Sequence, residues 1–319
     1  MGSTGALSRV RRSTLTAAFR RVVFASICTV GVSALGAAPA GVGGKEQVRA
    51  MRKIFISVDM EGIAGVVQPA QLGPDGFEYA KAREWATGEV NAAIEGARAA
   101  GATEFLVCDS HGNAQNLLID QLPDEVRVVR GFPRPLEMMQ GIDQTFDAVL
   151  FIGYHAGEWS VDAVRTHTMS SAKLLGIKLN GQDVMEAVFN AAIAGHFGVP
   201  VAFMSGDRVA VTQFQMTIPA VEGVVLKEPY GFHSAMTVTP AKARQLIREG
   251  VTRALRKGGA TPFRLKTPIE LEVGFKLTAD AEKAAYIPGL TRVDAHAVRG
   301  TFPDMLAISR LMQILTSLS

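Results

Sequence analysis

Two acidic residues, Asp59 and Glu61, follow directly after the apolar run at residues 54–56. A short apolar run of this kind predicts a buried strand, so both carboxylates emerge where that strand leaves the core. A half-buried carboxylate without a partner loses much of its hydration, and a divalent cation would supply the missing positive charge. The pair therefore indicates a metal site. Capping of a helix, or pairing with an arginine, is the structural alternative.

The same pattern occurs at two further places in the chain. The apolar run at residues 104–108 leads into Asp109 and His111, and the run at residues 148–152 leads into His155. Oxygen and imidazole ligands without a thiolate suit zinc, manganese, cobalt or iron. Histidines that are hydrogen-bonded to the backbone are the alternative, but their equivalent places at strand ends favour ligation.

Glu186 completes the candidate set, in the first turn of a helix predicted at residues 184–197. The helix dipole alone would favour an acid there, so the position by itself is a weak indication of a ligand. Three carboxylates nearly balance two divalent ions and would overcharge a single one, which favours two metals per chain. The candidate ligands are Asp59, Glu61, His111, His155 and Glu186.

Alternating strands and helices must bring these residues together. Such alternation predicts an α/β fold with a mostly parallel sheet and helices on both faces. In these sheets ligands bind beyond the carboxyl ends of the strands, where the candidate residues fall. The predicted strands lie at residues 53–58, 104–108, 148–152, 174–179 and 201–204, and the predicted helices at residues 77–100 and 184–197.

The pattern changes after residue 214. Residues 51–214 are predicted to form a metal-binding α/β domain, and residues 215–319 a smaller C-terminal α+β domain. Thr239 and Pro240 are a typical N-cap and first residue of a helix. The predicted elements of the second domain are a helix at residues 239–257, a strand at 269–275, a helical turn at 279–286, a strand at 292–298 and a helix at 304–318.

The first forty residues are predicted to be an export signal. Five arginines and no acid precede the apolar stretch at residues 22–35, and the small residues at 37–40 offer cleavage sites. We expect residues 41–50 to form a Gly-rich joint and the mature protein to be periplasmic. A retained membrane anchor is the alternative, but the apolar stretch is shorter than the ~20 residues of a spanning helix. The pair Arg11-Arg12 also permits a twin-arginine signal.

The charge of the chain gives no indication of a nucleic-acid surface. The 33 basic and 30 acidic residues give a formal net charge of +3. Five of the basic residues lie in the signal, so residues 41–319 hold 28 basic and 30 acidic residues and a charge near −2. Cys28 also lies in the signal, which leaves Cys108 without a partner for an internal disulfide.

The combined motifs resemble those of the D-aminopeptidase family of metallopeptidases. The resemblance covers essentially the whole chain after the signal. Its departures are the export segment and the loop at residues 157–165, whose length and composition differ. The motifs that carry it are the segment 57–65, Asp109-Ser110-His111, the segment 153–156, His167, Glu186 ahead of Asn190, and the segment 303–306.

The resemblance implies that the five candidate ligands bind a dinuclear zinc centre and that His167 is catalytic. His167 lies in a polar segment, which argues against a place in the core, and a structural histidine is the alternative. The family also implies a ring-like homo-oligomer, such as a decamer. Asp109, Asp207 and Arg208 could orient ligands or hold a substrate terminus, and salt bridges within the fold explain them equally well. The sequence identifies no substrate-binding residue.

The expected function is therefore that of an exported dinuclear-zinc aminopeptidase, which releases N-terminal D-amino acids from short peptides or amides by metal-activated water. Its partners would be short peptides, with no nucleic acid and, after cleavage of the signal, no membrane. One alternative is a metal-dependent hydrolase of other amides or L-peptides. Another is a non-catalytic protein that captures peptides for an importer, which would gain nothing from a full ligand set and a catalytic histidine.

Overall fold

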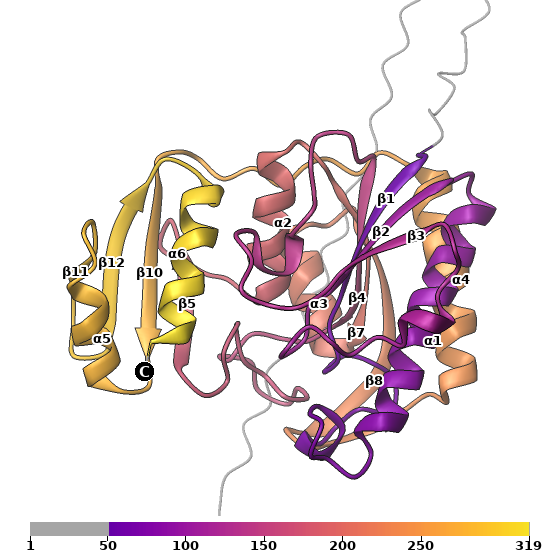
Figure 1. Ribbon diagram of the computed structural model, residues 1–319, viewed down its shortest axis with the longest axis horizontal. Coiled ribbons are helices and arrows are strands. Elements are labelled where there is room, and N and C mark those ends of the chain that lie inside the picture. The colour runs from indigo at the N-terminus through magenta and orange to yellow at the C-terminus, as the bar shows by residue number, and fades with distance from the viewer. Residues whose placement is uncertain (1–50, 319) are drawn as a thin grey trace, which may run out of the picture. The chain divides into compact units, whose positions relative to one another are not determined.

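The computed structural model describes residues 51–318, so the predicted export signal at residues 1–40 and the joint at residues 41–50 lie outside the described part of the chain. Within residues 51–318, none of the helices is both long enough and apolar enough to cross a membrane. These residues form a larger and a smaller β-sheet, with helices packed against both (Figure 1).

The larger sheet has seven strands in the order β3-β2-β1-β4-β7-β8-β9. All neighbours are parallel except β8 and β9. Because β1 lies between β2 and β4, the carboxyl ends of these three strands meet at one edge. The strands are β1 (Lys53–Val58), β2 (Glu104–Asp109), β3 (Val126–Val129), β4 (Ala148–Tyr154), β7 (Val201–Asp207), β8 (Glu222–Gly231) and β9 (Ser234–Thr237).

Helices cover both faces of this sheet, with α1 and α4 on one face and α2 and α3 on the other (Figure 1). Ile54 and Ile56 pack into the core beneath α1 and α4, whereas Phe55 packs into the core beneath α2 and α3. Burial on both faces explains why these strands are continuous apolar runs. The helices are α1 (Tyr79–Ala99), α2 (Glu186–His196), α3 (Arg208–Thr217) and α4 (Pro240–Lys257).

The smaller sheet is antiparallel, in the order β11-β12-β10-β5-β6. The strand predicted at residues 269–275 is β10, in which buried and partly exposed residues alternate. Helix α6 lies between this sheet and α2, and all three contribute to one core (Figure 1). The elements are β5 (Leu174–Leu179), β6 (Gln182–Asp183), β10 (Ile269–Phe275), β11 (Thr291–Arg292), β12 (Ala297–Phe302), α5 (Thr278–Ala285) and α6 (Met305–Ser317).

The predicted fold class, a mostly parallel sheet with helices on both faces plus a smaller α+β part, is confirmed. The division predicted at residue 214 differs from the membership of the two sheets. Strands β8 and β9 and helix α4 extend the larger sheet, whereas β5 and β6 belong to the smaller one. Residue patterns predict that a segment is a strand, but they do not specify which distant strand it pairs with.

Two shorter elements also differ from the prediction. The strand predicted at residues 292–298 is divided between β11 and β12, which are antiparallel neighbours. Before β4, where a helix would continue the alternation of strands and helices, the chain forms a single 3-10 turn, Glu137–Met139. The N-cap prediction agrees with the structure, because the hydroxyl of Thr239 accepts a hydrogen bond from Lys242 N at the start of α4.

Candidate metal centre

Strand ends of the larger sheet carry four of the five candidate ligands. Asp59 and Glu61 follow β1, His111 follows β2 and His155 follows β4. Since these strands are neighbours and parallel, their carboxyl ends place the four side chains together. Glu186 is the first residue of α2, which packs against β4. The structure thus brings all five candidate ligands into one site.

Two glycines allow the loop after β1 to lie directly against the end of β4. The N–H of Gly62 donates to Gly153 O at 2.7 Å, and a Cβ on Gly62 would overlap the carbonyl oxygen of Tyr154. Gly153 has a φ of +73°, and a Cβ there would overlap the carbonyl oxygen of Asp59. Only glycine fits at both positions. This close approach brings Asp59 next to His155.

Asp59, Glu61 and His111 form the first group of ligand atoms, all of which lie within 4.8 Å of one another. His111 Nδ1 lies 2.9 Å from Glu61 Oε2 and 3.2 Å from Asp59 Oδ1. Both acidic side chains are only 3% exposed. This group could therefore hold one ion in a nearly dry position.

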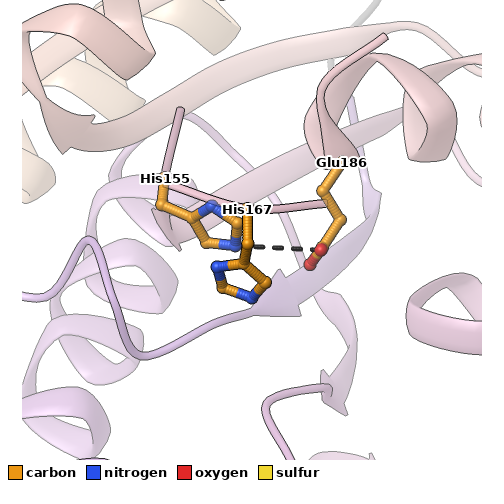
Figure 2. A group of neighbouring side chains, drawn as sticks. All are labelled: His155, His167 and Glu186. Atoms are coloured by element: carbon orange, nitrogen blue, oxygen red, sulfur yellow. Dashed lines mark ion pairs between the residues drawn. The ribbon is translucent and has the colours of Figure 1, made fainter. Parts of the chain in front are cut away.

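His155, His167 and Glu186 form the second group (Figure 2). His155 Nε2 lies 3.7 Å from Glu186 Oε2, the ion pair drawn as a dashed line. The rings of His155 and His167 stack, with centroids 4.0 Å apart and an interplanar angle of 11°. His167 Nε2 is also 4.0 Å from Glu61 Oε1. The structure thus brings the predicted catalytic histidine into the ligand cluster itself.

Asp59 connects the two groups through its two carboxylate oxygens. Its Oδ1 lies 3.2 Å from His111 Nδ1, and its Oδ2 lies 3.2 Å from His155 Nε2. A hydrogen bond of 2.8 Å from Met60 N to Oδ1 fixes the orientation of the carboxylate. A carboxylate that faces two ligand groups in this way could contribute an oxygen to each of them.

Each of the three imidazoles has one ring nitrogen at a backbone carbonyl and the other directed at carboxylates. An N–H that donates to the carbonyl fixes the tautomer and leaves the second nitrogen able to bind a metal. This is the usual arrangement of metal-binding histidines. The carbonyl contacts are His111 Nε2 to Leu72 O at 2.9 Å, His155 Nδ1 to Ala156 O at 3.1 Å and His167 Nδ1 to Arg165 O at 2.8 Å.

Several ligand atoms are buried without a hydrogen-bond partner, namely Asp59 Oδ2, Glu61 Oε2 and His155 Nε2. Glu61 Oε2 lies 2.9 Å from His111 Nδ1, and Asp59 Oδ2 lies 3.2 Å from His155 Nε2, but neither contact has the geometry of a hydrogen bond. Buried polar atoms left unpaired are costly. A cation between these atoms would satisfy all of them, so the residues present fit a metal centre.

The charges in the cluster shift its pKa values strongly. Burial favours the neutral form of Asp59, but the hydrogen bond with His111 and the charges of His155 and His111 hold its pKa well below the usual value. Burial opposes the charged form of His155, yet the close carboxylate of Asp59, together with the charge of Glu186, raises its pKa to about 10. Without metal, protonated histidines thus neutralise the carboxylates, and metal ions would replace those protons.

His167 and Glu186 shift toward their neutral forms. Burial and the positive charge of His155 lower the pKa of His167 to about 4. Burial raises the pKa of Glu186 to about 7, although the charge of His155 lowers it in part. Titratable groups shifted in this way are typical of catalytic sites, where protons are exchanged near neutral pH.

An open cavity of about 750 Å³ lies over the cluster, large enough for a short peptide. Its wall also contains residues from the segment after His167 and from the end of α6. The cluster residues in the wall are Asp59, Glu61, His111, His167 and Glu186.

The remaining polar residues noted in the sequence have contacts within the fold. Asp109 accepts hydrogen bonds from the backbone N–H groups of residues 116 and 117 and so shapes the loop that follows His111. Asp207 caps α3, and Arg208 forms an ion pair with Glu228 at 2.8 Å. These contacts favour the structural alternative for all three residues.

Two buried ionisable residues near the site, Glu89 and Lys227, were missed by the sequence analysis. Both form hydrogen bonds to the loop that begins at Glu61. A signal for Lys227 existed, because it follows the apolar run at residues 224–226 just as Asp59 follows its own run.

The fold and site together define an α/β protein with a carboxylate and histidine metal centre at the carboxyl edge of its sheet. More particularly, the chain belongs to the D-aminopeptidase family, whose model matches residues 51–314.

A curated D-aminopeptidase of Bacillus subtilis (strain 168) is 32% identical over 272 residues, which is 84% of this chain and 97% of the relative. Among solved structures, the chain is similar to the Zn-dependent D-aminopeptidase DppA from Bacillus subtilis, described as a self-compartmentalizing protease. That match has a TM-score of 0.80 and 31% identity, and it covers 83% of this chain and 97% of DppA.

Proposed function

We propose that this protein is an exported aminopeptidase that uses two zinc ions to remove N-terminal D-amino acids from short peptides or amides. The observation that carries the proposal is the pair of ligand groups that meet at Asp59 in the wall of the cavity. The names of the related D-aminopeptidase and of the Zn-dependent DppA support both the metal and the reaction.

Charge balance supports two ions rather than one. Asp59, Glu61 and Glu186 supply three carboxylates, which a single divalent ion would leave with excess negative charge in a buried site. The first group offers His111 and the second offers His155, so each ion would have at least one imidazole and one carboxylate. Asp59 faces both groups through its two carboxylate oxygens.

Zinc ions bound here would polarise the scissile carbonyl and lower the pKa of a water molecule. The residues of the chain then have to orient the substrate and move a proton. Glu61 and Glu186 are the carboxylates placed to accept the proton of the attacking water.

His167 is the residue placed to pass a proton to the leaving amine. Its Nδ1–H donates to Arg165 O, so the neutral ring has a free Nε2 directed toward Glu61. A ring in this state must first receive a proton before it can donate one. We therefore assign His167 to a proton relay that runs from a carboxylate to the leaving amine.

Export and assembly are part of the same proposal. The arginines, apolar stretch and small residues in positions 1–40 support removal of a signal after Ala38 or Ala40. Intact mass on fractionated cells tests this, and full-length chain in the cytoplasm would contradict it.

The description of DppA as self-compartmentalizing supports a homo-oligomer. Light scattering on the mature protein tests that part.

Metal analysis of the purified mature protein, combined with assays of D- and L-aminoacyl amides, tests the function. We expect two zinc ions per chain, loss of activity with a chelator, and recovery on addition of zinc. Hydrolysis of other amides alone would instead favour the broader metal-dependent hydrolase. Peptide binding with neither metal nor turnover would favour a binding protein.

A further inference from the structure

Lys227 is a buried cation beneath the loop that carries two candidate ligands. Its exposure is only 1%, and it is not in the wall of the cavity. The ammonium group donates to the carbonyl oxygen of Glu61 and, at 2.7 Å, to that of Val66. One side chain therefore fastens both ends of the segment at residues 61–66.

An irregularity in β8 directs Lys227 inward. In the pairing with β7, Gly206 is opposite Val225 but Asp207 is opposite Lys227, so β8 has one extra residue at this point. Val225 is partly exposed, and strict alternation would bury Leu226 and expose Lys227. The bulge instead leaves both Leu226 and Lys227 buried.

Neighbouring residues hold the middle of the same segment. Glu89 Oε1 accepts a hydrogen bond from Ala64 N at 2.9 Å. Thr237, which pairs with Lys227 across β8 and β9, accepts one from Gly65 N at 2.9 Å. The segment is thus anchored at Glu61, Ala64, Gly65 and Val66 by side chains from α1 and from the β8–β9 pair.

We propose that Lys227 is a positioning residue of the metal centre, which holds the loop after β1 so that Asp59 and Glu61 face their histidine partners. The inference rests on the proposed function, because it concerns how the ligands of the same site are held in the orientation that binds zinc. Lys227 does not act on substrate, because its ammonium group is bonded to backbone carbonyls and lies outside the cavity wall.

The sign of the effect on zinc affinity separates positioning from simple electrostatics. A positive charge close to the site repels bound cations, so on electrostatic grounds alone removal of Lys227 would tighten zinc binding. If Lys227 orients the ligands, its removal weakens zinc binding instead, as loss of a residue that supports metal ligands commonly does.

Lys227→Met keeps an unbranched side chain that is one atom shorter and removes the charge. We expect its dissociation constant for zinc, measured by competition with a chelator, to rise ~10- to 100-fold. Amide hydrogen exchange at residues 62–66 of the metal-free protein should also become faster. Lys242→Met, an exposed lysine on α4, is the matched control and should change neither quantity. Zinc binding in Lys227→Met that is unchanged or tighter would overturn the proposal.

Lys227→Ala provides a second test by chemical rescue. Propylammonium added to this variant should fill the space and restore slow exchange at residues 62–66, whereas propanol should not. Equal effects of the two additives would show that only volume matters, against the proposal.

If both variants fail to fold, hydrogen exchange in the metal-free wild type tests the proposal, because unprotected amides at residues 62–66 would exclude a loop held in place by Lys227. Absence of zinc binding by the wild type would contradict the proposed function. Amide hydrogen exchange at residues 62–66 of the metal-free proteins would still test whether Lys227 holds the loop.

Discussion

At the scale of single residues, His167 has contacts that suit two roles. Its ring stacks on His155, and its Nε2 lies near Glu61, so it could bind an ion or transfer a proton. Its position differs from those of His111 and His155, because it follows a loop instead of a strand end. In the proposed centre, Asp59, Glu61, Glu186 and the two strand-end histidines would already provide ligands for two ions, which favours the catalytic role.

His167→Ala is therefore expected to keep the fold and both zinc ions while kcat falls ~100-fold or more, the scale of a lost proton donor. Zinc content by mass spectrometry and the rate on a D-alanyl amide measure the two effects. His196→Ala, an exposed histidine in the last turn of α2, is the control and should be fully active. If His167→Ala loses an ion, His167 is a ligand.

Glu89 makes stability depend on pH through its burial. Burial raises the pKa of its carboxyl from the usual 4.5 to about 8. The folded state therefore binds this proton more tightly than the unfolded state does. The stabilising contribution is complete below pH 4.5 and is lost as pH rises through about 8.

Glu89→Gln is neutral at every pH, so it should gain stability relative to the wild type as pH rises from about 5 to about 8. Each unit of pKa shift corresponds to about 1.4 kcal/mol, so the relative gain should reach a few kcal/mol. Denaturant unfolding of the metal-free proteins at the two pH values measures it. Glu95→Gln, on the exposed side of α1, should follow the wild type. A constant difference between Glu89→Gln and the wild type would contradict the assignment.

Some residues of the site could be predicted from sequence, and others could not, for a physical reason. Asp59, Glu61, His111 and His155 could be predicted because the carboxyl ends of parallel strands meet at one edge. Glu186 could be assigned only through the family resemblance, since the helix dipole gives an acid there another explanation. Lys227 was missed because a bulge reverses the face that alternation assigns to it.

At the scale of elements, helices were predicted closely and sheet membership was not. Helical periodicity and caps are local signals, so α1, α2 and α4 lie within two residues of their predicted limits. Strand pairing joins distant segments: β5 pairs with β10 across about ninety residues of chain. No local pattern reports such a pairing, which is why the boundary at residue 214 did not match the sheets.

The contact between the loop after β1 and the end of β4 predicts a large effect for Gly62→Ala. The new Cβ would overlap the carbonyl oxygens of Tyr154 and Gly153, which belong to the backbone and cannot move aside easily. We expect a loss of about 1 to 3 kcal/mol in unfolding free energy, as for overpacked cores, together with weaker zinc binding. Thermal unfolding and zinc titration measure the two effects.

Gly73→Ala is the matched control for this substitution. It lies in the same loop region, but a Cβ there would have nothing within 4 Å. The control should therefore leave both the unfolding free energy and zinc binding close to those of the wild type. Equal effects of the two substitutions would show that the close contact at Gly62 does not decide the geometry of the ligands.

At the scale of the whole molecule, the site depends on segments from most of the described chain. Its candidate ligands extend from Asp59 to Glu186, Lys227 supports them from β8, and the cavity wall includes Gln313 of α6. A peptide in the cavity would therefore contact both the loops at the strand ends of the larger sheet and the end of α6, which packs against the smaller sheet. This arrangement separates the chemistry, which the metal cluster provides, from substrate choice, which the rest of the wall must provide.

Selection of one enantiomer must come from that wall. A metal centre and water can attack either hand of substrate, so chirality is recognised by where the α-amine and side chain are held around a fixed carbonyl. The wrong hand displaces the reacting atoms by about 1 Å, which is enough to lose ~100-fold in rate. We therefore expect D-alanyl amides and D-Ala-D-Ala to be cleaved at least ~100-fold faster than their L counterparts.

The comparison should use kcat/KM for each enantiomer, measured on the same zinc-loaded preparation, so that metal content cancels from the ratio. Acetylation of the amino terminus serves as the matched change in substrate: it removes the charged amine without altering the scissile bond, and turnover should cease. If the acetylated substrate is cleaved, the amine is not recognised and the enzyme is not an aminopeptidase. If both hands react equally, the metal-dependent hydrolase remains but the preference for D-amino acids does not, because the cavity wall then holds the two carbonyls equally well.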